Sequence, residues 1–282
     1  MIIKLISHLY ELIGLLPFAA LKMSFMQRAF LAILLLSPLC SVVGTLVIQF
    51  RMAFFSDAVA HSTFTGVAVG LLLGIDPWLA VLFFGVLTGI FAVRIKKRGE
   101  LSMDTTLGVL FSSTIAFGLA VISMKKGLSK TLPGFLYGDI LSINDNDIIL
   151  IFCLALFSWI FLVFFYNKLL YISLNDHLAR ISGISVDLLE TLFAALLAVI
   201  VAFAIRIVGI LLVTALLVIP AAAAKNMAGN LRGQVWTAIV ISLTASFCGM
   251  ATSVSFDIAA GAAMILWSAL FFIISMIVRG FR

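Results

Sequence analysis

The sequence predicts an all-α, polytopic membrane protein with about eight to ten transmembrane helices. Of its 282 residues, 64% are hydrophobic and 11% are charged, whereas a soluble domain is about half apolar and about a quarter charged. A soluble chain needs a mostly polar exterior, so this composition excludes a cytosolic globular enzyme and a nucleic-acid-binding module. Alternating apolar and polar strands are absent from the sequence, which argues against a membrane β-barrel.

Long apolar runs bounded by charge, Gly or Pro indicate nine spans. They cover approximately 29–50, 52–75, 77–95, 105–123, 148–168, 187–206, 208–224, 234–253 and 258–278. Residues 5–21 form a tenth, shorter candidate, which either crosses the membrane or lies at its interface as an amphipathic helix. We therefore expect 1–282 to be a single transmembrane domain, with 1–25 as its N-terminal amphipathic or spanning segment.

The distribution of Lys and Arg predicts the orientation. The densest basic cluster is Arg94, Lys96, Lys97 and Arg98, which places that loop in the cytoplasm. Alternating spans outward from it puts most of the other basic residues on the cytoplasmic side as well. The loop at 169–186 then also lies in the cytoplasm.

That cytoplasmic loop carries the pattern of a short amphipathic helix. Ser173 or Asn175 is a suitable N-cap, and Gly183 is a suitable C-cap. Its apolar side chains recur at i, i+4 and i+7, on Leu174, Leu178 and Ile181. An apolar face of this kind needs a partner, which is either the protein's own membrane domain or another subunit.

Asp57 and His61 stand out because most spans contain no charge. They are four residues apart and share a helix face, which Thr65 extends. If the helix starts near Arg51, His61 lies roughly 15 Å deep, near the membrane midplane. An ionisable residue at that depth costs several kcal/mol unless it is paired or hydrated, so it indicates a functional site.

Three interpretations of this pair are open. Imidazole suits zinc and iron and carboxylate suits manganese, so the pair is a candidate for metal binding. It is also a candidate proton relay, or a structural hydrogen bond that holds two helices together. Two side chains do not fill a metal coordination shell, so a partner subunit, water or another helix would have to complete it.

The neighbouring stripe of the same span consists of small residues spaced four apart: Ala58, Ser62, Gly66, Gly70 and Gly74. Small residues at this spacing are typical of close helix–helix approach in lipid. We expect Ser62, Gly66, Gly70 and Gly74 to bring another backbone close to the face that carries Asp57 and His61.

Other polar residues have structural interpretations. Asp187 and Glu190 stand at the inner end of a span, where a helix N-terminus favours carboxylates. Cys40, Cys153 and Cys248 lie in apolar runs without CxxC spacing and are interpreted as buried small hydrophobes. No GxxxxGK[ST] phosphate loop occurs, so ATP-driven transport would need a separate nucleotidase.

Four segments resemble one family of proteins. Residues 51–70, with Asp57-Ala58-Val59-Ala60-His61-Ser62 followed by Gly66-Val67-Ala68, resemble the signature of the ABC-3 family of zinc and manganese importer permeases. Residues 104–111, 136–141 and 209–222 are similar to further segments of that family. The matches occur in order along the chain, from about residue 30 to 280.

The resemblance implies a multi-pass permease of the bacterial inner membrane with an ABC type II importer fold. Such permeases form homodimers, bind a separate cytoplasmic ATP-binding subunit and receive metal from an extracytoplasmic metal-binding protein. The cargo would be zinc, manganese or iron, with Asp57 and His61 handling the metal and no tightly bound cofactor. The chain itself would not be an enzyme.

The resemblance also assigns the cytoplasmic helix as the coupling helix that docks on the ATPase. Its residues are Leu174, Asn175, Asp176, Leu178, Ala179, Arg180, Ile181 and Gly183. The family commonly has Asp-Pro-Glu where this chain has Asp176-His177-Leu178.

Two alternatives remain from the residues. One is a gradient-driven secondary transporter in which Asp57 and His61 relay protons. The other is an intramembrane hydrolase, which is weakly supported because neither GxSxG nor HExxH occurs.

Overall fold

The computed structural model describes Tyr10, Ile13 and residues 23–98, 103–124, 143–209 and 213–280. Within these residues the elements are all helices: α2 (Ser24–Gln49), α3 (Phe55–Leu73), α4 (Pro77–Arg98), α5 (Met103–Met124), α7 (Asp145–Leu174), α8 (Asp176–Ile181), α9 (Val186–Val208), α10 (Val213–Met227), α11 (Leu231–Phe256) and α12 (Ala260–Gly280). Eight of them are long and apolar enough to cross a membrane, and α10 is a shorter apolar helix.

The prediction of an all-α membrane protein is therefore confirmed, and each of the nine expected spans corresponds to one helix. The candidate span at 5–21 lies outside the described residues, apart from Tyr10 and Ile13. The whole segment 136–141 lies outside them as well, within the undescribed residues 125–142.

Asparagine side chains define where several helices begin. The side chain of Asn175 accepts a hydrogen bond from Leu178 N (3.0 Å) at the start of α8. Asn230 does the same for Gly233 N (2.6 Å) at the start of α11. These side chains satisfy backbone N–H groups that have no partner within the helix, so the two helices begin at these positions.

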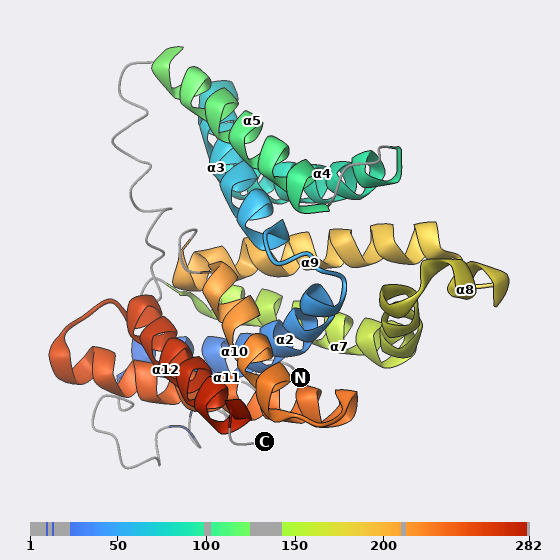
Figure 1. The fold of residues 1–282 in the computed structure, drawn as a ribbon. Coiled ribbons are helices and arrows are strands. Elements are labelled where there is room, and N and C mark those ends of the chain that lie inside the picture. Colours follow the sequence, from blue (N-terminus) through green and yellow to red (C-terminus); the bar gives the residue numbers. More distant parts are fainter. Residues whose placement is uncertain are drawn as a thin grey trace.

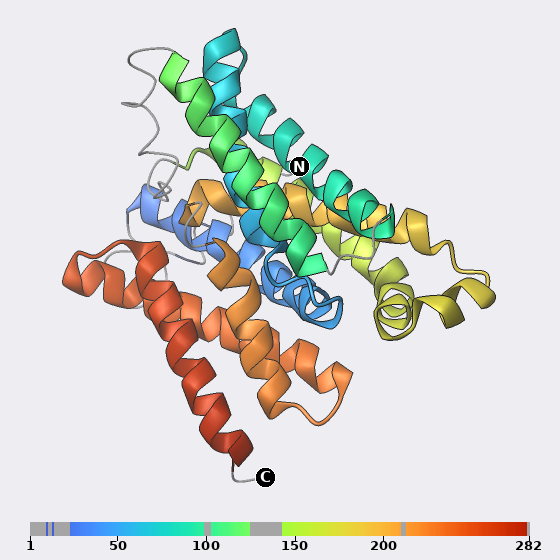
Figure 2. The same ribbon diagram turned by 45° about the horizontal axis from the view of Figure 1, so that its top comes forward.

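Helix α9 lies between two groups of helices (Figures 1 and 2). On one side, α3 packs closely on both α4 and α5, and α4 also packs along α9. On the other side, α2 contacts α7, α10 and α11, while α12 packs on α10 and α11. The helix that carries Asp57 and His61 thus belongs to the group formed by α3, α4 and α5.

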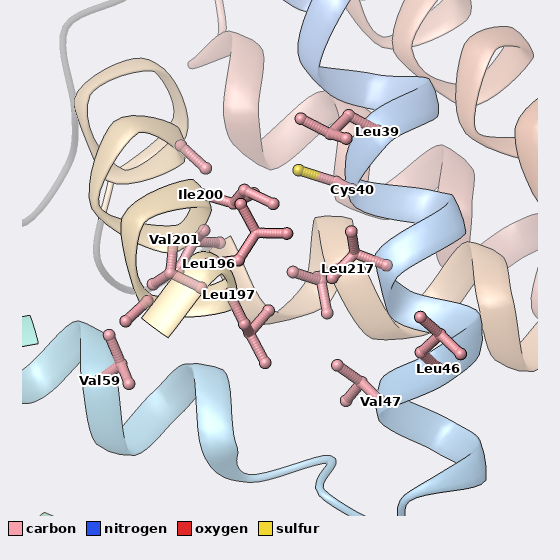
Figure 3. Close-up of a cluster of buried hydrophobic side chains, with 14 of the residues drawn as sticks. Leu39, Cys40, Leu46, Val47, Val59, Leu196, Leu197, Ile200, Val201 and Leu217 are labelled. Atoms are coloured by element: carbon pink, nitrogen blue, oxygen red, sulfur yellow. The ribbon is translucent and has the colours of Figure 1, made fainter. Parts of the chain in front are cut away.

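Buried apolar side chains fill the junction where α2, α3, α9 and α10 meet (Figure 3). Val59 of α3 and Leu217 of α10 both point into this core, opposite Leu197 of α9. Cys40 also lies there and is fully buried, as expected. Cys153 is exposed and Cys248 is only partly buried, so the expectation was wrong for both. The core holds the first two turns of α3 against its neighbours.

Hydroxyl groups add hydrogen bonds between the apolar helices. Ser37 Oγ of α2 lies 2.7 Å from Ser242 Oγ and 2.6 Å from Ser246 Oγ, both on α11. All three side chains are buried. Such bonds stabilise helix association in lipid, where water does not offer alternative partners.

The end of α4 lies beside the start of α9, which α8 precedes (Figure 1). Lys97 Nζ is 2.9 Å from Asp187 Oδ1 across this contact. The two loops that the positive charges place in the cytoplasm therefore lie at the same end of the protein. We take this end as cytoplasmic.

Candidate metal-transport site

Helix α3 begins at Phe55, four residues later than the start near Arg51 assumed from the sequence. His61 therefore lies only about 9 Å along the axis from the start of its helix, which corrects the depth estimate. Met52, before the helix, and Phe55, its first residue, are nevertheless inside the protein at 2% and 0% exposed, whereas Phe54 is 59% exposed. Packing against the rest of the chain, and not distance from Arg51, positions Asp57.

Asp57 is bound to a helix of the opposite group. The hydroxyl of Thr214, the second residue of α10, donates a hydrogen bond to Asp57 Oδ1 at 2.5 Å. Asp57 is also in the first turn of α3, where the helix dipole favours a carboxylate. This bond links the α3–α4–α5 group to α10 at the site itself.

His61 contacts α5. Its ring lies edge-on to Phe111, with ring centroids 4.7 Å apart. Among the described residues no hydrogen bond or ion pair joins His61 to Asp57, although they share a face. The structural Asp–His hydrogen bond considered for this pair is not formed in this conformation.

Thr65 continues the same face of α3 along α5. Its hydroxyl donates to the carbonyl oxygen of Thr114 at 2.5 Å. Gly118 of α5 permits this approach, because a Cβ there would lie 2.6 Å from Thr65 Oγ1. The face of Asp57, His61 and Thr65 thus runs along α5 and reaches α10 at its Asp57 end.

The small-residue stripe of α3 packs against α4, whereas the face that carries Asp57 and His61 does not. A Cβ at Gly66 would lie 2.7 Å from the carbonyl oxygen of Ala80, and one at Gly70 would lie 2.9 Å from Ala80 Cβ. The hydroxyl of Ser62 donates to Val59 O at 2.7 Å and lies 3.5 Å from Phe84 O of α4. The close approach was correctly predicted, but it occurs on the neighbouring face.

Gly74 does not belong to this packing. It follows the last residue of α3 with φ 70°, and no atom of another residue lies within 4 Å of a Cβ built on it. Glycine adopts this left-handed conformation without strain, so Gly74 ends the helix. Its assignment to the packing surface near the site is corrected accordingly.

Asp57 and His61 place a carboxylate and an imidazole on adjacent turns of one helix. In the described part of the chain, no group of three or more His, Cys, Asp and Glu side chains could hold a metal ion. Thr214 is the neighbour that sequence reasoning missed. The sequence feature that could have indicated Thr214 is its position in the segment 209–222, which contains no other hydroxyl group.

The cytoplasmic helix α8 is shorter than expected. Leu174 is the last residue of α7, so it does not belong to the amphipathic helix, and Ser173 is not its N-cap. Gly183 lies two residues beyond α8 with φ 76°. The apolar side chains of Leu178 and Ile181 are 49% and 83% exposed, so the described part of the chain does not cover them.

Comparison with known proteins identifies the family. The profile of the ABC 3 transport family matches residues 22–279. The chain belongs to the ABC 3 transport family. This agrees with the resemblance found in the short segments of the sequence.

Several relatives in the ABC 3 transport family match over nearly their whole length. The high-affinity zinc uptake system membrane protein ZnuB of Haemophilus influenzae is 30% identical over 251 residues, which are 89% of this chain and 96% of ZnuB. The manganese import system permease protein ScaB of Streptococcus gordonii is 31% identical over 254 residues, 90% of this chain and 91% of ScaB.

Solved structures share the fold. PsaBC from Streptococcus pneumoniae, solved in complex with Fab, superimposes with a TM-score of 0.78 at 30% identity, covering 98% of this chain and 95% of that one. An inward-facing putative metal-chelate type ABC transporter gives 0.74 at 15% identity and covers 98% and 99%; at that identity the likeness concerns the fold alone. The expected ABC importer permease architecture is confirmed.

Thr214 provides a direct test of the link to α10. Thr214→Val keeps the shape of the side chain but removes the hydroxyl that donates the hydrogen bond to Asp57. We expect metal uptake to fall about 10-fold, as for other groups that orient a metal ligand. Uptake is measured with the assembled transporter in vesicles, and Thr244→Val, at an exposed hydroxyl of α11 that bonds only within its own helix, is the control. Equal uptake by both variants would show that Thr214 does not position Asp57.

Proposed function

We propose that this chain is the permease subunit of an ATP-driven importer for a divalent transition metal, zinc, manganese or iron. Family membership supports the permease class, and the relatives named above are zinc and manganese transport proteins. The observation that carries the proposal is the placement of Asp57 and His61 on α3, with Asp57 bonded across to α10. The cargo therefore meets a carboxylate oxygen and an imidazole nitrogen between two groups of helices.

Transport requires that these groups bind the ion weakly enough to release it. Asp57 and His61 come from one helix, while Thr214 and Phe111 come from α10 and α5. A shift of the α3–α4–α5 group relative to α10 would separate Asp57 from Thr214 and change the side of the membrane to which the site opens. Both ligands move together in this scheme because they are one turn apart.

Partners complete the transporter in this proposal. A cytoplasmic ATP-binding subunit hydrolyses ATP and docks on the exposed apolar face of α8. A second copy of the permease forms the homodimer, and an extracytoplasmic metal-binding protein delivers the ion. The assembly lies in the bacterial inner membrane, and this chain performs no hydrolysis itself.

Uptake into proteoliposomes tests the proposal against a gradient-driven transporter. The permease is reconstituted with two further components. One is the ATP-binding subunit that co-purifies with it, and the other is the metal-binding protein. Zn²⁺ or Mn²⁺ should accumulate only when ATP reaches the ATP-binding subunit. Accumulation by this chain alone, driven by a pH gradient and indifferent to ATP, would instead identify Asp57 and His61 as a proton relay.

The exposed face of α8 gives a second test. Ile181→Asp places a charge on the most exposed apolar side chain of α8, and we expect it to weaken ATPase binding about 10-fold or more, as for a central interface residue. The affinity of the purified permease for the ATP-binding subunit is measured directly. Leu231→Asp, the same change at the start of α11, where a carboxylate suits the helix N-terminus, should leave binding unchanged. Equal affinities would rule out α8 as the docking element.

A further inference from the structure

A cluster of charged side chains joins three helices at the cytoplasmic end of the protein. Its members come from the end of α4, from α8 and from the start of α9: Lys96, Lys97, Arg180, Asp187 and Glu190. The sequence suggested only that the two carboxylates suit a helix N-terminus. In the structure Asp187 pairs with Arg180 of α8 and with Lys97 of α4. Glu190 pairs with the lysines of α4, and Figure 1 shows where these three helices lie.

Asp187 is at the centre of this cluster. The guanidinium of Arg180 donates to both of its carboxylate oxygens, at 2.8 and 3.2 Å. Lys97 Nζ lies 2.9 Å from Oδ1 and also donates to the main-chain oxygen of Asp187 at 3.3 Å. The hydrogen bonds to Asp187 raise the pKa of Arg180 above its ordinary value. One residue thus holds both α8 and α4 against the first turn of α9.

The two sides of the cluster differ in their exposure to water. Glu190 is 8% exposed and lies 3.2 Å from Lys97 Nζ, so this link between α9 and α4 is largely withdrawn from solvent. The side chains of Arg180 and Asp187 are 46% and 63% exposed. Breaking a buried ion pair is costly, whereas an exposed pair is screened and contributes little to stability. The link to α4 is therefore firm, and the link to α8 is easily made and broken.

Helix α4 is in turn fitted against the start of α3. Gly89 of α4 faces both the ring of Phe55 and the carbonyl oxygen of Ala194 on α9, and a Cβ on it would lie 3.1 Å from each. Phe55 is fully buried and precedes Asp57 by two residues. Because no space separates these elements, a displacement of α4 along α9 has to move the first turn of α3.

We propose that Asp187 is the positioning residue that transmits movement of α8 to α4 and, through Phe55, to the Asp57/His61 site. This inference rests on the proposed function, since movement of α8 is attributed to the ATP-binding subunit. The covalent connection moves α7 and α9 with α8. The contacts of Asp187 with Arg180 and Lys97 tie the side of α8 to this movement. The largely buried pair of Glu190 and Lys97 holds α4 to α9, so α4 moves with them.

The number of metal ions imported per ATP hydrolysed tests the proposal. Proteoliposomes contain the full permease as wild type or Asp187→Asn, its ATP-binding subunit and its metal-binding protein, with radioactive Zn²⁺ or Mn²⁺ as the probe. We expect Asp187→Asn to assemble normally and to hydrolyse ATP at the wild-type rate. The number of ions per ATP should fall about 10-fold, within the range seen for residues that couple distant sites.

Asp257→Asn is the matched control, because it removes the same charge at an exposed position beyond α11, where φ is 54° and asparagine is well tolerated. It should keep the wild-type ratio. A wild-type ratio for Asp187→Asn, or a parallel loss of assembly, hydrolysis and uptake, would overturn the proposal, since the residue would then be dispensable or only structural. If the wild-type complex itself shows no ATP-driven uptake, the proposed function fails and this inference fails with it.

Discussion

Asp57→Asn and His61→Ala should each reduce metal uptake by at least about 100-fold, because changes to groups that merely orient a ligand already cost 10- to 100-fold. Asp57→Asn removes the negative charge from the only acidic side chain of α3, and His61→Ala removes its only imidazole. Neither change touches α8, so binding of the ATP-binding subunit should be unaffected. Uptake is measured in vesicles and divided by the amount of assembled complex, so that a loss of transport activity is distinguished from a loss of folded protein.

The control for Asp57→Asn is Asp76→Asn. Asp76 precedes α4 and accepts a hydrogen bond from Trp78 N at 2.7 Å, and asparagine caps a helix equally well. This variant should transport normally. Uptake close to wild type in both the Asp57 and the His61 variants would remove these residues from the transport path and leave the family membership intact.

Gly66→Val should disrupt the packing of α3 on α4. A Cβ at Gly66 would lie 2.7 Å from a backbone oxygen of Ala80, and backbone cannot move aside as a flexible side chain can. The helices have to separate, which we expect to lower the stability of the folded state by about 3 kcal/mol, the upper part of the range for overpacking. Thermal unfolding of the purified protein in detergent measures the loss. Uptake should fall in parallel, because Gly66 and His61 are on the same helix.

Gly108→Val tests whether the effect is steric. Gly108 lies inside α5, and apart from its chain neighbours and the adjacent backbone of α5 no atom is within 4 Å of a Cβ built on it. Valine has a higher helix propensity than glycine, so this variant should be as stable as the wild type or slightly more stable. A similar loss in both variants would contradict the close approach of α3 and α4.

Much of the fold could be predicted because the membrane imposes it. A span needs about 20 apolar residues with all backbone groups paired inside the helix, so runs such as 29–50 and 234–253 indicated their helices directly. The scarcity of charge also made Asp57 and His61 visible. Local capping was readable too, since the side chain of Asn175 caps α8 as one of the two proposed N-caps.

Errors arose where a local pattern had two interpretations. Gly74 continues the spacing of the small stripe, but spacing does not reveal that its backbone is left-handed. Leu174 continues the apolar pattern of α8, yet it belongs to α7 because the chain turns at Asn175. In both cases the periodicity of the side chains was correct and the end of the helix was misjudged.

By itself, the sequence determined the membrane class, the helices, the family and the two ionisable residues inside a span. It could do so because hydropathy and charge act along the chain, over the length of one helix. The tertiary structure alone decided what those residues contact: α10 through Thr214, α5 through Phe111, and α4 along the small stripe. These contacts join segments up to 157 residues apart, and helix periodicity specifies which residues share a face but not which helix will cover it.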